Sequence, residues 1–110
     1  MRPTDTISQL RKGALDLAVL ALLSRAPTYG GALLQQLATL PALAVTEGTL
    51  YPLLSRLRSQ GLVTANWEPS PVGPPRKYYA LTARGHTALS TQAEDWRNLA
   101  TALNALLEHQ

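Results

Sequence analysis

The sequence has no cysteine, no long hydrophobic run and no secretory signal layout. Without cysteine, disulfide frameworks, thiol nucleophiles and thiolate metal sites are excluded. The longest unbroken apolar run, Leu17 to Leu23, is too short to cross a bilayer. Asp5 and Asp16 flank this run, which is untypical of a signal peptide. We therefore expect a cytoplasmic protein without membrane contact.

The motifs of common enzyme classes are missing as well. There is no G-x-S-x-G motif and no phosphate-cradling glycine loop, and the carboxylates are scattered. The adjacent Glu94 and Asp95 would point in different directions on a helix. His86 and His109 have neither metal-ligand spacing nor a partnered nucleophile. The sequence thus predicts no catalytic residue, no metal and no cofactor, and an enzyme is the least supported class.

Charge is unevenly distributed along this chain of 110 residues, a length typical of one domain. Residues 1–85 carry nine basic and four acidic side chains, whereas residues 86–110 carry one basic and three acidic. A basic body followed by a weakly acidic segment predicts a polyanionic partner for the body.

The spacing of apolar residues predicts a first helix from Ser8 to Arg25. Apolar side chains recur at helical spacing on one face, and others fill most of the opposite face. A helix that is apolar nearly all round needs partners on two sides. A small domain can hardly cover both, so a second copy of the chain is expected there.

Two further helices and two strands follow. Pro27 ends the first helix, Thr28 is a candidate N-cap for the second, and Pro41 ends that one. The third helix is expected from Thr46 to about Gln60, with Gly61 behind it and a buried stripe of Leu50, Leu53, Leu54 and Leu57.

Alternation then predicts strands at residues 63–68 and 76–81, joined by a stiff tip with four prolines. Thr82 is the expected cap of a last helix. Three helices and a hairpin are the order of a winged helix-turn-helix, in which the third helix enters the DNA major groove. The predicted fold is mainly α with a small β-hairpin, divided into a DNA-binding domain (1–82) and a C-terminal dimerisation helix (83–110).

The predicted third helix presents a small, smooth outer face. With the leucine stripe inward, Pro52 and Ser55 point outward, Thr49 and Arg56 lie on one flank, and Tyr51 lies on the other. Such a face can approach a groove floor while its flanks reach phosphates and base edges. Arg76 and Lys77 near the wing tip are candidates for phosphate contacts.

Several segments together resemble the PadR family of winged-helix transcriptional regulators. They are Pro27-Thr28-Tyr29-Gly30, Glu47-Gly48-Thr49-Leu50-Tyr51-Pro52, Gly61-Leu62-Val63 and Arg76-Lys77-Tyr78-Tyr79-Ala80-Leu81-Thr82, within about residues 10–100. The single short C-terminal helix is similar to that of the compact subgroup.

The resemblance implies that Thr49 and Tyr51 contact the operator, and that Lys12, Tyr29 and Lys77 touch the phosphate backbone. It also implies dimerisation through the first and last helices. The candidate DNA-binding set is Lys12, Tyr29, Thr46, Thr49, Tyr51, Ser55, Arg56, Arg76 and Lys77.

The last predicted helix carries a heptad-like seam that suits packing against another chain. Trp96 lies on this seam as dimer core or, as in similar multidrug-responsive members, as a stacking platform for a planar ligand. The candidate interface set is Leu15, Val19, Leu89, Trp96, Ala100, Leu103 and Leu107.

The prediction is a homodimeric, sequence-specific DNA-binding repressor. It would bind a pseudo-palindromic operator in double-stranded DNA and be released by a stress signal or a small aromatic effector. The alternative is a winged-helix module that binds protein and has lost DNA binding. The basic body and the Tyr51 and Lys77 pair favour the regulator.

Overall fold

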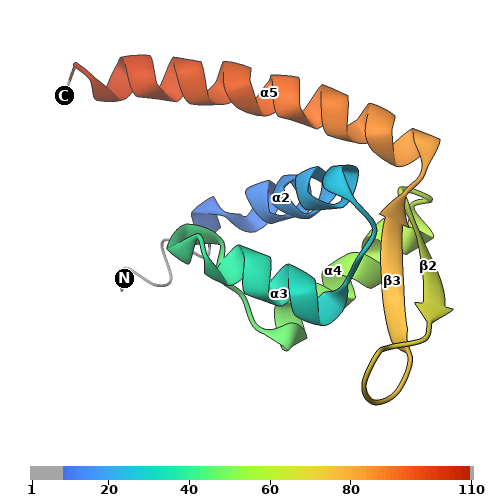
Figure 1. Cartoon of the computed structure of the whole chain (residues 1–110). Coiled ribbons are helices and arrows are strands. Elements are labelled where there is room, and N and C mark those ends of the chain that lie inside the picture. The colour runs from blue at the N-terminus through green and yellow to red at the C-terminus, as the bar shows by residue number, and fades with distance from the viewer. Residues whose placement is uncertain (1–8, 110) are drawn as a thin grey trace.

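The computed structural model describes residues 9–109, and Ser8 lies outside them. The elements in chain order are α2 (Lys12–Arg25), β1 (Thr28–Tyr29), α3 (Gly30–Ala38), the 3₁₀ turn η1 (Pro41–Leu43), α4 (Glu47–Ser59), β2 (Val63–Glu68), β3 (Arg76–Leu81) and α5 (Ala83–Leu107). The fold is a winged helix followed by one long helix (Figure 1), which confirms the predicted fold class. No helix within residues 9–109 has both the length and the hydropathy needed to span a membrane.

The sheet has three antiparallel strands in the order β1-β3-β2, one more than predicted. Thr28 pairs with Tyr79, and Tyr29 pairs with Tyr78. The prediction that Thr28 caps the second helix is therefore wrong. Its hydroxyl donates to the carbonyl of Ala26 at 2.9 Å, while Tyr29 stands at the start of α3. A β-branched and an aromatic residue suit the edge that β3 leaves open.

The core lies between α2, α3, α4 and the inner face of the sheet. Its largest fully buried side chains are Val19, Leu20, Leu33, Leu37, Leu50, Leu54 and Leu57. Leu15 and Val19 were predicted for the dimer interface, and this is corrected, because they are only 4% and 0% exposed within one chain. The face of α2 that remains accessible carries Leu17 and Ala21 instead.

Local sequence signals set the ends of the last two helices. Thr46 is the N-cap residue of α4, and Gly61 follows the helix with a φ of 76° that favours glycine. Pro52 lies inside α4, which nevertheless continues to Ser59. The Thr82 hydroxyl accepts a hydrogen bond from the Gly85 N–H at 3.0 Å, which confirms the predicted cap of α5.

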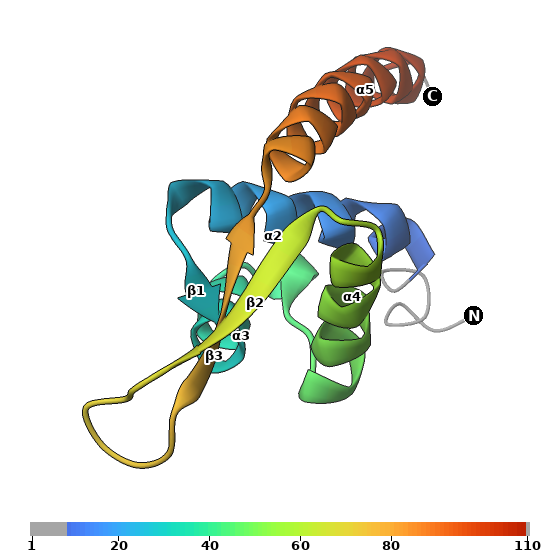
Figure 2. The ribbon, with the colours of Figure 1, turned by 90° about the vertical axis from the view of Figure 1, so that its right-hand side faces the viewer.

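The long helix α5 runs over α2 and then projects beyond the body of the molecule (Figure 1). The view turned by 90° shows the wing of β2 and β3 extending away from α5 on another side (Figure 2). The molecule thus has two separate projections, one made of strands and one of helix.

Candidate nucleic-acid interface

Helix α4 turns its leucine stripe inward and its small residues outward. Leu50, Leu53, Leu54 and Leu57 are at most 5% exposed, which confirms the predicted orientation of the helix. Gly48, Pro52 and Ser55 are exposed on the other side. This face has no bulky side chain, so it can approach a surface such as a groove floor closely.

Tyr51 packs against the beginning of α3. A Cβ added at Gly30 would overlap the Tyr51 phenol ring, so the two elements meet closely only because residue 30 is glycine. Tyr51 is still 40% exposed and can contact a ligand. Burial raises the pKa of the Tyr79 phenol most, and the nearby Tyr51 raises it further, while Arg58 lowers it.

Aromatic rings hold two cations at the end of the hairpin ladder nearest the wing tip. The Arg76 guanidinium lies over the Tyr29 ring, 4.3 Å from its centre, and Tyr29 meets Tyr78 edge-on with ring centres 5.4 Å apart. The Lys77 Nζ lies 5.8 Å from the centre of the Trp67 ring. Such cation–π contacts orient the positive groups while leaving them partly exposed.

These side chains surround an open groove between the wing, α3 and α4, with a volume of about 450 Å³. Five predicted DNA-binding residues line it: Tyr29, Tyr51, Ser55, Arg76 and Lys77. Gly30, Gly31, Trp67, Pro75 and Tyr79 complete the lining. The groove combines hydroxyl groups, two cations and aromatic faces, which is the chemistry that holds a sugar–phosphate strand.

The other candidates lie outside this groove. Lys12, Thr46 and Thr49 are exposed at or near the first turns of α2 and α4. Arg56 is engaged within the chain, because Nη1 and Nη2 donate to the Asp16 carboxylate at 2.6 and 3.1 Å. The hydrogen bond to Asp16 raises the pKa of Arg56. Arg56 thus links α4 to α2 while its side chain stays 48% exposed, and its predicted contact with DNA stays a prediction.

Trp67 is the most exposed large side chain in the groove, and sequence reasoning did not select it. It lies on β2 opposite Lys77 and is 68% exposed. Period-two alternation with Val63 and Ala65 could have placed it on the inner face of the hairpin.

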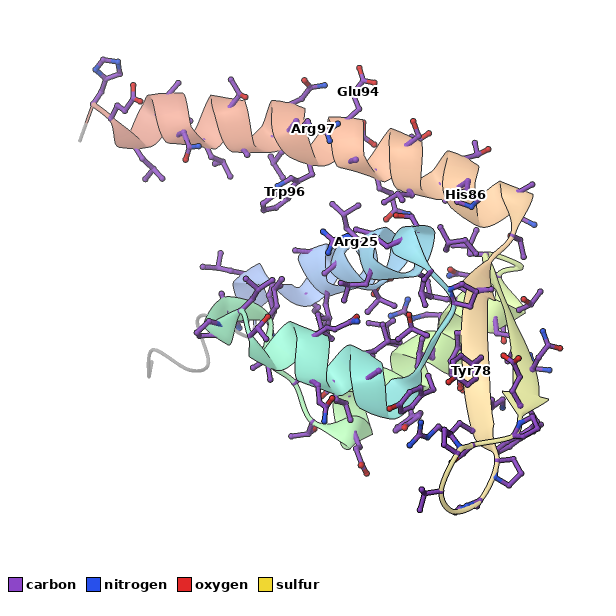
Figure 3. The ribbon with its side chains drawn as sticks, in the orientation of Figure 1. Arg25, Tyr78, His86, Glu94, Trp96 and Arg97 are labelled. Atoms are coloured by element: carbon purple, nitrogen blue, oxygen red, sulfur yellow. The ribbon has the colours of Figure 1, made fainter. Side chains whose placement is uncertain are left out.

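A second accessible region lies between α2 and α5. Two adjoining hollows of about 520 and 370 Å³ share Leu17 and Trp96 in their linings. Trp96 points from α5 toward α2 (Figure 3) and is 46% exposed. Leu89 packs against the core of its own chain, whereas Leu103 and Leu107 are 48% and 60% exposed. Ala100 is partly exposed.

Two further leucines on α5 belong to the exposed apolar surface. Leu99 and Leu106 are 54% and 72% exposed, and neither lies at a position of the predicted seam. The apolar surface is therefore broader than a narrow heptad stripe.

Among residues 9–109, no three His, Asp or Glu side chains are grouped so that they could hold a metal ion.

The fold and the groove define a class, the winged helix-turn-helix proteins. Residues 19–91 match the model of the transcriptional regulator PadR-like family, and the chain belongs to this family. It is thus related to transcriptional regulators rather than to enzymes.

Three solved structures illustrate the similarity. A PadR family regulator from Eggerthella lenta is 37% identical, covers 97% of this chain and 93% of its own, and has a TM-score of 0.84. A PadR-like regulator from Bacillus cereus is 35% identical, with coverages of 91% and 97% and a TM-score of 0.83. A PadR-like transcription factor from Bacteroides fragilis is 40% identical, with coverages of 93% and 98% and a TM-score of 0.75.

Proposed function

We propose that this chain is a homodimeric repressor that binds a pseudo-palindromic site in double-stranded DNA. The observation that carries the proposal is the groove between α4 and the wing, where Tyr51, Arg76 and Lys77 meet. Two cations and exposed hydroxyl groups suit phosphates, and the small outer face of α4 suits the floor of a major groove. Thr46 and Thr49 would extend the contact at the start of α4, and Lys12 would add one from the start of α2.

The dimer is proposed to form along α5. Large apolar side chains remain exposed on this helix, and water-exposed apolar surface of this extent is typical of an interface. The proposed contact set is Trp96, Leu99, Ala100, Leu103, Leu106 and Leu107. A twofold axis would present two α4 helices about 34 Å apart, one turn of DNA. Residues 1–82 would then bind DNA and residues 83–110 would join the two copies.

Trp96 is also proposed to receive a small planar effector. The hollow between α2 and α5 has an apolar lining that includes Leu17, Ala21 and Leu89, with the indole of Trp96 at its edge. An aromatic ligand could stack on this indole. Binding there would alter the packing of α2 on α5 and so release the DNA. The predicted cytoplasmic location stays a prediction.

DNA binding is tested by selecting duplexes from a random library and measuring fluorescence anisotropy at two salt concentrations. We expect sequence preference that persists at the higher salt. Tyr51→Ala should reduce discrimination between selected and shuffled duplexes. Lys77→Ala should weaken binding to both and lower the salt slope by about one. A folded dimer that binds neither duplex would instead support the protein-interaction module.

Repression and release need a separate experiment. A reporter placed behind the selected site should be silenced by the wild-type protein and not by the Tyr51→Ala variant. Planar aromatic compounds should quench the fluorescence of Trp96 in a Trp67→Phe protein and restore transcription. Activation of the reporter would overturn the repressor assignment while leaving DNA binding intact.

A further inference from the structure

We infer that Trp67 is a DNA-contacting residue whose indole lies against the sugar–phosphate backbone of the strand in the groove between the wing and α4. This inference deepens the proposed function and rests on it.

The position of Trp67 on the hairpin is set by the strand register. Trp67 pairs with Lys77, and Ala65 pairs with Tyr79. Successive side chains alternate between faces, so Trp67 shares a face with Ala65 and Val63. Val63 and Tyr79 are buried at 2% and 6% exposure, which identifies this face as the one turned toward the helices. Trp67 therefore occupies the inner face of the wing, where the hairpin extends past the core.

Within one chain, the Trp67 side chain remains largely uncovered. It is 68% exposed, although the hairpin directs it toward the groove lined by Tyr51 and Ser55. A second copy bound along α5 would not cover it, because the wing and the far end of α5 project from different parts of the molecule (Figures 1 and 2). A ligand bound in the groove would therefore cover this ring.

The charges around the ring favour a polyanion. The Lys77 Nζ lies 5.8 Å from the ring centre, and Arg76 borders the same groove over Tyr29. Glu68 is adjacent in sequence and pairs with Arg76 across the strands, but it is not among the residues that line the groove. A nucleic-acid strand offers phosphates for the two cations, while its deoxyribose offers an apolar surface for the indole and an acceptor for its N–H.

A neutral ring leaves a signature that a cation does not. Lys77 neutralises a phosphate and contributes to counterion release, so its removal lowers the salt slope. The indole releases no counterion. Trp67→Ala should therefore weaken binding about tenfold at every salt concentration, to selected and shuffled duplexes alike, with the slope unchanged. Asn66→Ala, an exposed residue on the other face of β2, is the matched control and should bind as the wild type does.

The two tryptophans of the chain allow a direct optical test. Trp96→Phe leaves Trp67 as the only tryptophan, and Trp67→Phe leaves Trp96. Titration with the selected duplex should quench and blue-shift the emission of Trp67, with saturation at the concentration given by anisotropy. The emission of Trp96 should stay nearly constant. Circular dichroism establishes that each variant is folded before titration.

The outcomes separate this inference from the proposed function. If anisotropy reports DNA binding but Trp67 emission is unchanged and Trp67→Ala binds normally, the inference is overturned and the regulator stands. A Trp67→Ala variant that changes the salt slope as Lys77→Ala does would show that the ring only positions Lys77, which also overturns it. Absence of DNA binding by the folded wild type would overturn both proposals.

Discussion

The leucines of α4 and the leucines in the outer half of α5 differ in how far they are exposed to solvent. On α4, every leucine of the stripe is at most 5% exposed, whereas Leu99, Leu103, Leu106 and Leu107 on α5 are 48–72% exposed. Both helices carry an apolar face of similar periodicity. The difference is that the stripe of α4 packs against α2, α3 and the sheet in its own chain. The outer half of α5 only borders open hollows beside α2, at Trp96 and Leu99, and its leucines stay largely exposed.

The contrast shows that the body, made of α2, α3, α4 and the sheet, completes its apolar core within one chain, whereas the outer half of α5 does not. Apolar area removed from water stabilises a fold by about 25 cal/mol per Å². The body gains this contribution from one copy alone. The outer half of α5 can gain it only from a further surface, so its stability should depend on protein concentration.

The largest expected effect is in the body, where the core is closed within one chain. Leu54→Ala should lower the free energy of unfolding by about 2–5 kcal/mol, because a fully buried leucine leaves a cavity. Denaturant unfolding at two protein concentrations measures it, with the half-exposed Leu40→Ala as a control expected within about 0.5 kcal/mol. Equal losses in the two variants would contradict the contrast.

The next largest effect is expected in the outer half of α5. Leu103→Glu should weaken self-association about 100-fold, since a charge would have to be buried in the interface. Sedimentation equilibrium provides the measurement. Thr101→Glu adds the same charge on the opposite side of α5 and should leave the dimer intact. A wild-type protein that is monomeric at high concentration would remove the basis of the comparison.

A smaller effect is expected where α3 meets α4. Gly30→Ala should cost about 1–3 kcal/mol, because the added methyl group overlaps the Tyr51 ring and one of the two must move. Gly13→Ala is the control, since a Cβ there meets no atom within 4 Å and alanine favours a helix by up to about 1 kcal/mol. Thermal unfolding should shift in opposite directions for the two variants.

The smallest effect concerns the ion pair that links α2 to α4 within the body. Asp16 and Arg56 are partly exposed, so a double-mutant cycle should give a coupling below about 1 kcal/mol. DNA binding should be more sensitive: Arg56→Ala alone should leave the salt slope unchanged, whereas in an Asp16→Asn background it should lower the slope by about one. A lower slope for Arg56→Ala alone would mean that Arg56 meets a phosphate despite Asp16.

The outcome of the sequence predictions follows the distance over which each interaction acts. Strands β2 and β3 occupy the predicted residues, because alternation and the proline-rich tip are local signals. Strand β1 was missed, since Thr28 pairs with a strand some fifty residues later. The pairing of Arg56 with Asp16 was missed for the same reason, as the two residues lie 40 positions apart.

The first helix shows a different limit of the same reasoning. Leucine, valine and alanine side chains lie on nearly every face of α2, so periodicity could not distinguish the face turned to the core from the face left open. The structure buries Leu15 and Val19 and leaves Leu17 at the hollow beside α5. The groove residues were found more completely, yet Trp67 was not, because its exposure depends on how far the hairpin extends past the helices.

The contact of Gly85 with Leu62 has a geometric consequence. A Cβ at Gly85 would overlap the Leu62 carbonyl oxygen, so the first turn of α5 rests directly on the backbone that precedes β2. The 25 residues of α5 span about 37 Å at 1.5 Å each, so a tilt of about 5° at this turn displaces the far end by about 3 Å. The packing at Gly85 therefore sets the direction in which α5 leaves the body. In a twofold assembly along α5, the separation of the two α4 helices would be set where this one side chain is missing.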